Sequence, residues 1–493
     1  MRALIAGLMV IAVGCDNFEL LRQLKPRKVT IRANDVARAK DGTEVQVPLP
    51  AAGEAPCELW VDASLNAGWH KYEGKWVSDG LCEVRDVLPG ETLVRVPGKQ
   101  LWVTIALDEV DLGVDYLGRK IERAAAGTTL TLDLQGAAPL STQTVLQAHL
   151  YDFGEGVSNV FGSGSGGIGI PMGMNGATSF PVTMKWDQLP LLKAGEPLQV
   201  FQGTNTPVGT AALQFSLVKR GTADVVPTSG KNVRAAVAMT DIGTRTPAFP
   251  GVAYDPGPLY EKLKLELPAP VLLGTLLEQS AAVPGSFNNV PLQTTFTIDD
   301  AVKFNAPPTS VEPFPGQAWN QRVSVAIFYE SFVGSDKDPP KGALTLTNVM
   351  HGPANDLAWL QSAAMTPVRN IKARAPGFEP VFVGAIESTS FTLTWDVPVQ
   401  GLPNTYVVQP YKVTVDKDST GKDIVKFARL AQSFRVSRPE AHIPPDVLDG
   451  NASYVFSITA ENCTAADAKR PRRINVQSTC GLAENRSFVL ATP

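Results

Sequence analysis

The sequence predicts a mainly β protein built from tandem β-sandwich domains, with few and short helices. Apolar and polar residues alternate in short runs, for example over 130–134 and 391–395, which is the pattern of strands that bury one face. Glycine (42) and proline (39) are scattered along the chain, as expected for many turns. A chain of 493 residues exceeds the ~250–300 residues over which a single core usually grows, so several domains are expected.

Composition limits the classes of partner. Hydrophobic residues make up 44% of the chain and charged residues 19%, which is typical of folded protein rather than of disordered chain. The net charge of −4 provides no general attraction for nucleic acid. We therefore expect no nucleic-acid partner.

The N-terminus predicts export. Arg2 precedes an apolar run over 3–14, which is shorter than the ~20 residues needed to cross a bilayer and is typical of a signal peptide. The segment Ala12-Val13-Gly14-Cys15 resembles a bacterial lipobox. This resemblance implies that Cys15 is acylated as the mature N-terminus, which would anchor the protein firmly in a membrane. The implied location is the cell envelope of a Gram-negative-type bacterium, on the periplasmic face or the cell surface. The alternative is a secretory signal with an incidental cysteine.

The cysteine count also favours export. Apart from Cys15, the chain has Cys57, Cys82, Cys463 and Cys480. Four cysteines can form two disulfides in three ways, and the natural choice is the one in which both bonds are local in sequence, Cys57–Cys82 and Cys463–Cys480. Disulfides persist in oxidising compartments. No Cys-x-x-Cys motif occurs and histidines number four, so we expect no zinc site, no other metal and no cofactor.

Seven segments are expected along the chain. They are a signal peptide (1–14), a tether (15–27), a β domain containing Cys57–Cys82 (28–126), a β-sandwich domain (127–241), a Pro/Gly-rich linker (242–258), a β domain with a short helix (259–373) and a last β domain (374–493). In the third domain, alternating Leu263, Leu265 and Leu267 predict a strand, and 355–365 predicts the helix, with Leu357 and Leu360 on its buried side.

The last domain carries a second resemblance. The segments Phe391–Trp395, Tyr411–Val415 and Leu448–Ala460 resemble strands of fibronectin type III domains. The resemblance implies an immunoglobulin/fibronectin III-like sandwich with Trp395 in its core. It also implies a tyrosine corner, in which the Tyr454 hydroxyl bonds to backbone upstream. Members of this family act mostly as spacers or binding modules, so no chemistry is implied.

A group of aromatic residues in the first domain, Trp60, Trp69, Tyr72 and Trp76, is the candidate ligand-binding site. If Glu73-Gly74 is a two-residue hairpin turn, Trp69 and Trp76 share one face of the sheet at ~7–8 Å, and Tyr72 lies on the other face. Two flat rings on one face suit a sugar or a partner protein. The alternative is that this face forms the core of the domain.

The remaining motifs indicate no catalytic residues. Gly162–Gly167 fits a dinucleotide-binding string without the flanking strand and helix, and it is interpreted as a flexible loop. Asp416–Gly421 resembles the start of a calcium loop, but Phe427 stands where the bidentate acid belongs, so a hairpin tip is favoured. The basic residues 469–473 are typical of a solvated loop. Neither a zinc-protease motif nor a Gly-x-Ser-x-Gly elbow occurs.

These observations favour a lipid-anchored envelope protein that is not an enzyme. It would act as a binding, adhesion or scaffold module, with the membrane as one partner through its lipid and an envelope protein or polysaccharide as another. Two alternatives stay open. One is an envelope polysaccharide hydrolase that uses acidic residues, and the other is a purely structural spacer.

Overall fold

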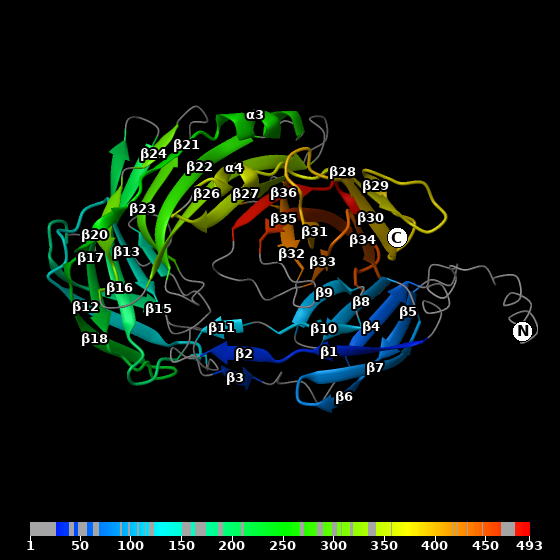
Figure 1. The fold of residues 1–493 in the computed structure, drawn as a ribbon, viewed down its shortest axis with the longest axis horizontal. Coiled ribbons are helices and arrows are strands. Elements are labelled where there is room, and N and C mark those ends of the chain that lie inside the picture. The colour runs from blue at the N-terminus through cyan, green and yellow to red at the C-terminus, as the bar shows by residue number, and fades with distance from the viewer. Residues whose placement is uncertain are drawn as a thin grey trace, which may run out of the picture.

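The computed structural model shows four successive β units that form an arch, with the first unit lying beneath the last (Figure 1). Its two described helices are α3 (Gly257–Glu266) and α4 (Trp359–Ala363). The structure describes residues 26–38, 44–47, 57–62, 69–88, 91–96, 99–105, 108–113, 115–117, 123–149, 159–162, 174–185, 191–208, 212–266, 271–282, 289–297, 303–306, 308–315, 319–333, 342–355, 357–417, 419–421, 423–430, 432–445, 447–464 and 479–493.

The first unit is a sandwich of two sheets. One sheet contains β10 (Glu109–Asp111), β1 (Arg27–Arg32), β7 (Leu81–Val87) and β6 (Lys75–Ser78), and the other contains β5 (Trp69–Glu73), β4 (Glu58–Asp62), β8 (Glu91–Val96) and β9 (Lys99–Ile105). A small sheet of β11 (Asp115–Leu117), β2 (Asp35–Arg38) and β3 (Glu44–Val47) extends beside them. Ile31 and Val84 from one sheet pack with Leu59 from the other. The Cys57–Cys82 disulfide links the two layers.

The second unit is also a two-layered sandwich. One layer contains β15 (Ser179–Lys185), β12 (Thr129–Gln135) and β18 (Asn232–Ala238), and the other contains β14 (Asn159–Gly162), β13 (Thr144–His149), β16 (Leu198–Val208) and β17 (Ala212–Ala223), with β19 (Thr240–Asp241) beside β17. The alternation over 130–134 places Leu130, Leu132 and Leu134 in the core. The strand predicted there is confirmed.

The third unit is a long antiparallel sheet with one covered face. Its strands are β23 (Asn289–Thr297), β22 (Val271–Ala282), β26 (Asn320–Val333) and β27 (Gly342–Pro353). The cover consists of α3, α4, β21 (Val252–Tyr254) and β24 (Phe304–Ala306). β20 (Gly243–Phe249) pairs with β25 (Thr309–Glu312), and Val311 of β25 packs against a second cluster that includes Leu292 of β23. The short helix predicted within 355–365 is confirmed as α4, and Leu360 is buried as expected.

Two predictions for this region are wrong. The stretch 242–258, expected to be a linker, contains β20 and β21, and Val252 is buried in the core of the third unit. The strand expected at Leu263–Leu267 does not form, because the residues up to Glu266 belong to α3; Leu267 lies outside the described residues. Leu259 and Leu263, four residues apart, are both buried and lie on one face of a helix. The burial of this face against the sheet prevails over the local alternation of leucines.

The last unit is a sandwich of the expected class. One layer contains β28 (Arg369–Arg374), β30 (Phe391–Asp396) and β34 (Glu440–Ile443). The other contains β29 (Gly384–Ala385), β31 (Thr405–Lys417), β32 (Asp423–Arg429), β33 (Ser433–Val436), β35 (Ser453–Cys463), β36 (Cys480–Arg486) and β37 (Leu490–Ala491). Trp395 is buried and contacts Tyr406 edge-on, with ring centroids 5.3 Å apart. This unit includes β28 and therefore extends upstream of residue 374.

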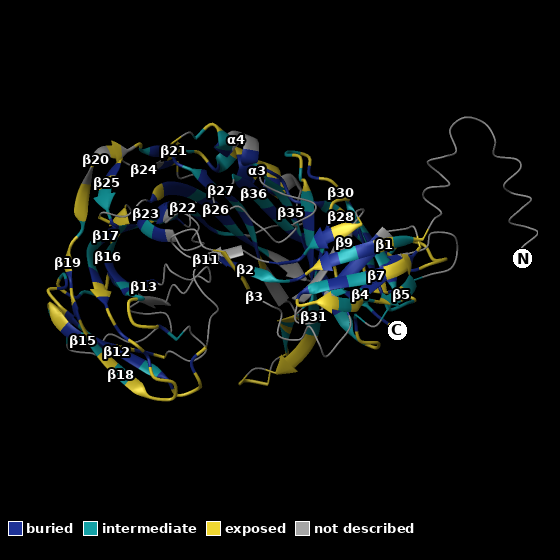
Figure 2. Ribbon diagram, turned by 60° about the horizontal axis from the view of Figure 1, so that its bottom comes forward, coloured by how far each residue is buried: buried dark blue, intermediate teal, exposed yellow. Residues whose placement is uncertain are grey.

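A continuous hydrogen-bonded series of strands joins the four units. β17 of the second unit pairs with β23 of the third, and β27 pairs with β36 of the last unit. The series returns to the first unit where β33 pairs in parallel with β9. Buried residues lie along the strands of this series, whereas the last residues of β31 are exposed (Figure 2). The units are therefore joined through their backbones as well as by their order in the chain.

Candidate functional site

Strand β4 buries both of its faces and so brings the first and last units together. Leu59 and Val61 lie in the core of the first unit, whereas Trp60, between them, lies in the core of the last unit. Successive side chains of a strand point to opposite faces. Leu93, the partner of Trp60 on β8, lies in that same core. Consecutive apolar residues indicate a strand buried on both faces, and the run 59–61 carries this signal in the sequence.

The contact between these units has three components. Ser433 to Arg435 of β33 pair with 101–103 of β9 through the backbone. Trp60 and Leu93 form the apolar component. In the third component, Trp69 meets His442 edge-on, with ring centroids 6.0 Å apart. The first and last units therefore share one core, which fixes their relative position.

The aromatic candidates of the first unit do not form one face. Trp69 is half-buried against the core of the last unit, whereas Trp76 and Tyr72 are half-buried against the core of the first. The Tyr72 hydroxyl accepts a hydrogen bond from the backbone N–H of Leu88 at 3.3 Å. The prediction that Trp69 and Trp76 lie side by side is therefore wrong, and they do not form a paired platform for a sugar.

The reason lies in the turn at Glu73-Gly74. β5 pairs with β4 in one sheet, and β6 pairs with β7 in the other, so no hairpin forms between β5 and β6. The chain instead crosses between the two layers at Gly74. A Cβ atom there would lie 2.3 Å from the sulfur of Cys57 and 2.4 Å from that of Cys82. Glycine is therefore required for the close approach of the backbone to the disulfide.

The tyrosine corner that the resemblance implies is present. The Tyr454 hydroxyl accepts a hydrogen bond from the Asp449 N–H at 2.9 Å. Leu448, just before this residue, is buried in the same core. The corner fixes the chain where it crosses between the layers of the last unit.

Buried polar groups connect the third and last units. The Glu484 carboxylate of β36 accepts hydrogen bonds from the Ser457 hydroxyl and from the Thr347 N–H, the latter at 3.2 Å. The Tyr329 hydroxyl donates to the backbone carbonyl of Glu484. Burial raises the pKa of the Glu484 carboxyl above its usual value, although these bonds oppose that shift. Because its partners come from β26 and β27 of the third unit and from β35 of the last, Glu484 joins strands of two units.

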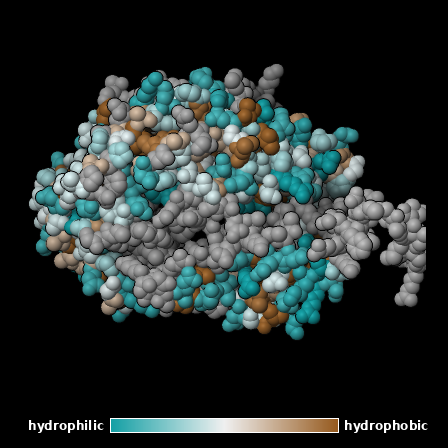
Figure 3. Space-filling view, in the orientation of Figure 1, coloured by the Kyte–Doolittle hydropathy of each residue, from teal (hydrophilic) through white to brown (hydrophobic). Residues whose placement is uncertain are grey.

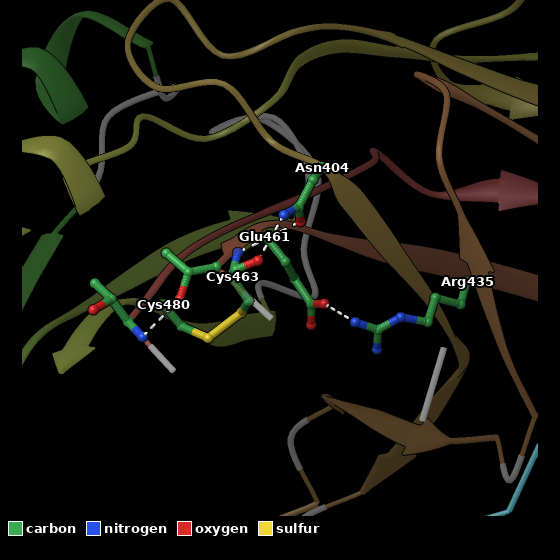
Figure 4. Close-up of a disulfide and its surroundings, with 7 residues drawn as sticks. Asn404, Arg435, Glu461, Cys463 and Cys480 are labelled. Atoms are coloured by element: carbon green, nitrogen blue, oxygen red, sulfur yellow. Dashed lines mark hydrogen bonds and ion pairs between the residues drawn. A yellow bond between two sulfur atoms is a disulfide. The ribbon is translucent and has the colours of Figure 1, made fainter. Parts of the chain in front are cut away.

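A second polar group lies next to the Cys463–Cys480 disulfide (Figure 4). Glu461 of β35 forms an ion pair with Arg435 of β33, and both side chains are largely buried. Burial raises the pKa of the Glu461 carboxyl, and the Arg435 charge opposes this. The Asn404 side-chain amide donates to the Cys463 carbonyl at 2.8 Å. The ion pair thus connects β35 to β33, the strand that pairs with β9 of the first unit.

Some of the remaining candidate residues lie in the part of the chain that the structure describes, and others do not. Both local disulfides, Cys57–Cys82 and Cys463–Cys480, form as predicted. Asp416 and Lys417 end β31, which pairs with β32, so a hairpin is formed here, as favoured. Of the glycine-rich motif, Gly162 ends β14. Residues 163–173, Cys15 and residues 469–473 lie outside the described residues.

The described residues contain neither a metal-binding cluster nor a helix that could span a membrane. Within the ranges given above, no three or more His, Cys, Asp or Glu side chains are grouped so that they could hold a metal ion. None of the helices in the described part of the chain has both the length and the apolar character needed to cross a membrane.

Comparisons with known proteins do not place the chain in a family. No protein-family model matches it, and no curated protein matches it. One solved structure with some similarity is a crystal structure of the tetra-tandem repeat in the extending region of a large adhesion protein. The two chains are 12% identical over 92% of this chain and 99% of the other, with a TM-score of 0.10. A similarity this low supports no inference about fold or function.

Proposed function

We propose that this chain is an exported, lipid-anchored protein of the bacterial cell envelope that acts as a rigid, non-enzymatic binding or scaffold module. Acylated Cys15 would hold it to the membrane. The four β units would present their outer surfaces to a partner protein or glycan of the envelope.

The pairing of the cysteines carries this proposal. Cys57 and Cys82 lie close enough to bond in the first unit, and Cys463 and Cys480 do so in the last. Bonds of this kind last in oxidising compartments such as the periplasm or cell surface. Cys15 is then the one cysteine outside these two pairs, which agrees with its role as an acylation site.

The contact between the first and last units supports a rigid module. Domains joined only by linkers move relative to one another by default. Here Trp60 and Leu93 of the first unit complete the core of the last, and strands β9 and β33 pair. The outer surfaces of the four units therefore keep fixed relative positions, which favours a scaffold over a flexible tether.

Mass spectrometry of the protein purified from its native envelope tests the export and anchor. The expected result is a mature chain that begins at acylated Cys15 and contains two disulfides, Cys57–Cys82 and Cys463–Cys480. An unprocessed chain with free thiols would overturn the proposal.

Crosslinking in intact cells then tests the binding role. We expect adducts with a small number of envelope components that the purified protein also binds. The competing hydrolase hypothesis predicts instead that the purified protein degrades an envelope polysaccharide. Such turnover, lost on substitution of a carboxylate without loss of folding, would contradict a non-enzymatic role.

A further inference from the structure

The last unit has an exposed group of large apolar side chains at one end. Their exposed fractions are 53%, 42%, 63% and 41%. We call this group the phenylalanine patch; it consists of Phe378, Phe382, Val383 and Phe488. The parallel pairing of β29 with β37 brings its two chain segments together, since the Gly384 N–H donates to the Val489 carbonyl at 3.0 Å. Residues 382–383 therefore lie beside residue 488.

The surroundings of the patch suit a lipid interface. The Lys372 ammonium lies 4.7 Å from the centroid of the Phe382 ring. Lysine stems cover apolar surface while the charged end stays in water, and aromatic rings with nearby lysines favour the boundary between lipid headgroups and acyl chains. Arg374 adds a second positive charge, and Glu379 and Glu387 add two negative charges, all exposed. The local charge is therefore balanced, and any membrane contact here depends on apolar insertion.

The patch lies at the end of the molecule where the described chain begins. The Arg27 side chain, at the start of β1, donates to the Thr92 hydroxyl of β8 at 2.5 Å. Thr92 is paired with Val61, and the next residue of β4, Asp62, is paired with Trp69. The start of β1 and Trp69 therefore lie at the same end of the first unit.

Trp69 of the first unit is in turn linked to the patch by a series of neighbouring residues in the last unit. Trp69 meets His442 edge-on, and the His442 Nδ1 atom is 3.1 Å from the Thr392 hydroxyl. Thr392 is paired with Arg374, the last residue of β28. The segment from Arg374 to β29 contains Phe378. Figures 1 and 2 both show β28 at the same end of the molecule as the start of β1.

The chain length between the lipid and the fold limits how far this end can lie from a membrane. Arg27 lies twelve positions after Cys15, so twelve residue steps connect the two. At ~3.3–3.6 Å per residue these steps reach about 43 Å at most. A tether of this length holds the patch at a high effective concentration near the bilayer.

We infer that the phenylalanine patch is a second membrane contact, which inserts into the interface of the bilayer that holds acylated Cys15. This inference rests on the proposed lipid anchor. The two contacts together would orient the protein, with the end that carries the patch on the lipid and the second and third units directed away from it.

Vesicle flotation tests the inference. The protein is the full mature chain with Cys15→Ser, so that only the fold can bind lipid, and the vesicles contain phosphatidylethanolamine and phosphatidylglycerol at 3:1. The test variant is Phe378→Ser/Phe382→Ser/Phe488→Ser. The control variant is Val397→Ser/Val399→Ser/Leu402→Ser. These control residues are 51%, 61% and 85% exposed and follow β30, whereas 375–383 precede it, so they lie beyond the other end of that strand.

We expect the test variant to reduce the partition coefficient about tenfold or more, because burial of phenylalanine in lipid is strongly favourable, and the control variant to leave it unchanged. Because the local charge is balanced, phosphatidylcholine vesicles should give the same ranking. Equal binding by the starting protein and the test variant would overturn the inference, as would an equal loss in the control. So would a dimer in sedimentation that the test variant dissociates, since the patch would then bind a second copy. Acylation is measured separately, so failure of the anchor is distinguishable from failure of the patch.

Discussion

Truncation of Leu93, a residue of the first unit, should destabilise the last unit. Leu93 is on β8 of the first unit but is buried in the core of the last. Removing a buried leucine side chain typically costs about 2–5 kcal/mol, because apolar contacts are lost and a cavity is left. Leu93→Ala should therefore weaken the last unit by at least about 2 kcal/mol.

Val94→Ala is the matched control. Val94 is adjacent on the same strand and equally buried, but it lies in the core of the first unit. Its truncation should cost about 2–3 kcal/mol, and this loss should fall on the first unit.

Amide hydrogen exchange measured by mass spectrometry distinguishes the two variants. Local opening free energies set the exchange rates of protected amides, so a loss of 2 kcal/mol accelerates exchange about 30-fold. With Leu93→Ala the acceleration should appear in β33 and β34, and with Val94→Ala it should be centred on β1 and β7. If Leu93→Ala loosened only β1 and β7 and left β33 and β34 protected, the shared core would be refuted.

Three further outcomes are expected. Gly74→Ala should lower the melting temperature and slow formation of the first disulfide, because the added Cβ would overlap both sulfur atoms; an unchanged rate of disulfide formation on refolding would contradict this. Tyr454→Phe should cost about 1–3 kcal/mol in urea unfolding, because the Asp449 N–H loses its partner; an unchanged midpoint would show that the corner contributes nothing. Burial lowers the pKa of His149 from 6.5 to about 4. The unfolded chain therefore takes up a proton first, and stability is lost as pH falls from 6.5 towards 4. His149→Gln should remove about 2–3 kcal/mol of the difference in unfolding free energy between pH 7 and pH 4.5, and an equal difference in both proteins would contradict the assignment.

Much of the fold follows from local patterns. Alternating residues predict strands wherever one face is buried and the other is wet, as in β12 and β30. The two disulfides follow from cysteines that are close in sequence. The spacing of Leu448 and Tyr454 indicates the tyrosine corner because that motif is local. Each of these features depends on residues that are near one another in the chain.

The features that were missed depend on distant partners. The apolar run 59–61 indicates a strand buried on both faces, but nothing near Trp60 indicates that it joins the core of the last unit, at the other end of the sequence. Glu73-Gly74 has the chemistry of a hairpin turn, but the disulfide beside Gly74 requires glycine for another reason. Leu263 and Leu265 alternate, yet the helical spacing of Leu259 and Leu263 prevails because these two leucines are buried in the core of the third unit. Local sequence cannot supply any of these tertiary contacts.

Cleavage between the first and second units tests the shared core most directly. A protease site inserted between Ala126 and Gly127, which lie in an exposed turn, would separate the first unit from the rest of the chain covalently. The two fragments should stay together in size-exclusion chromatography after cleavage, because Trp60, Leu93 and the pairing of β9 with β33 still hold them. They should separate when Trp60→Asp is introduced. Separation of the unmutated fragments on cleavage would contradict a core shared by the two ends of the chain.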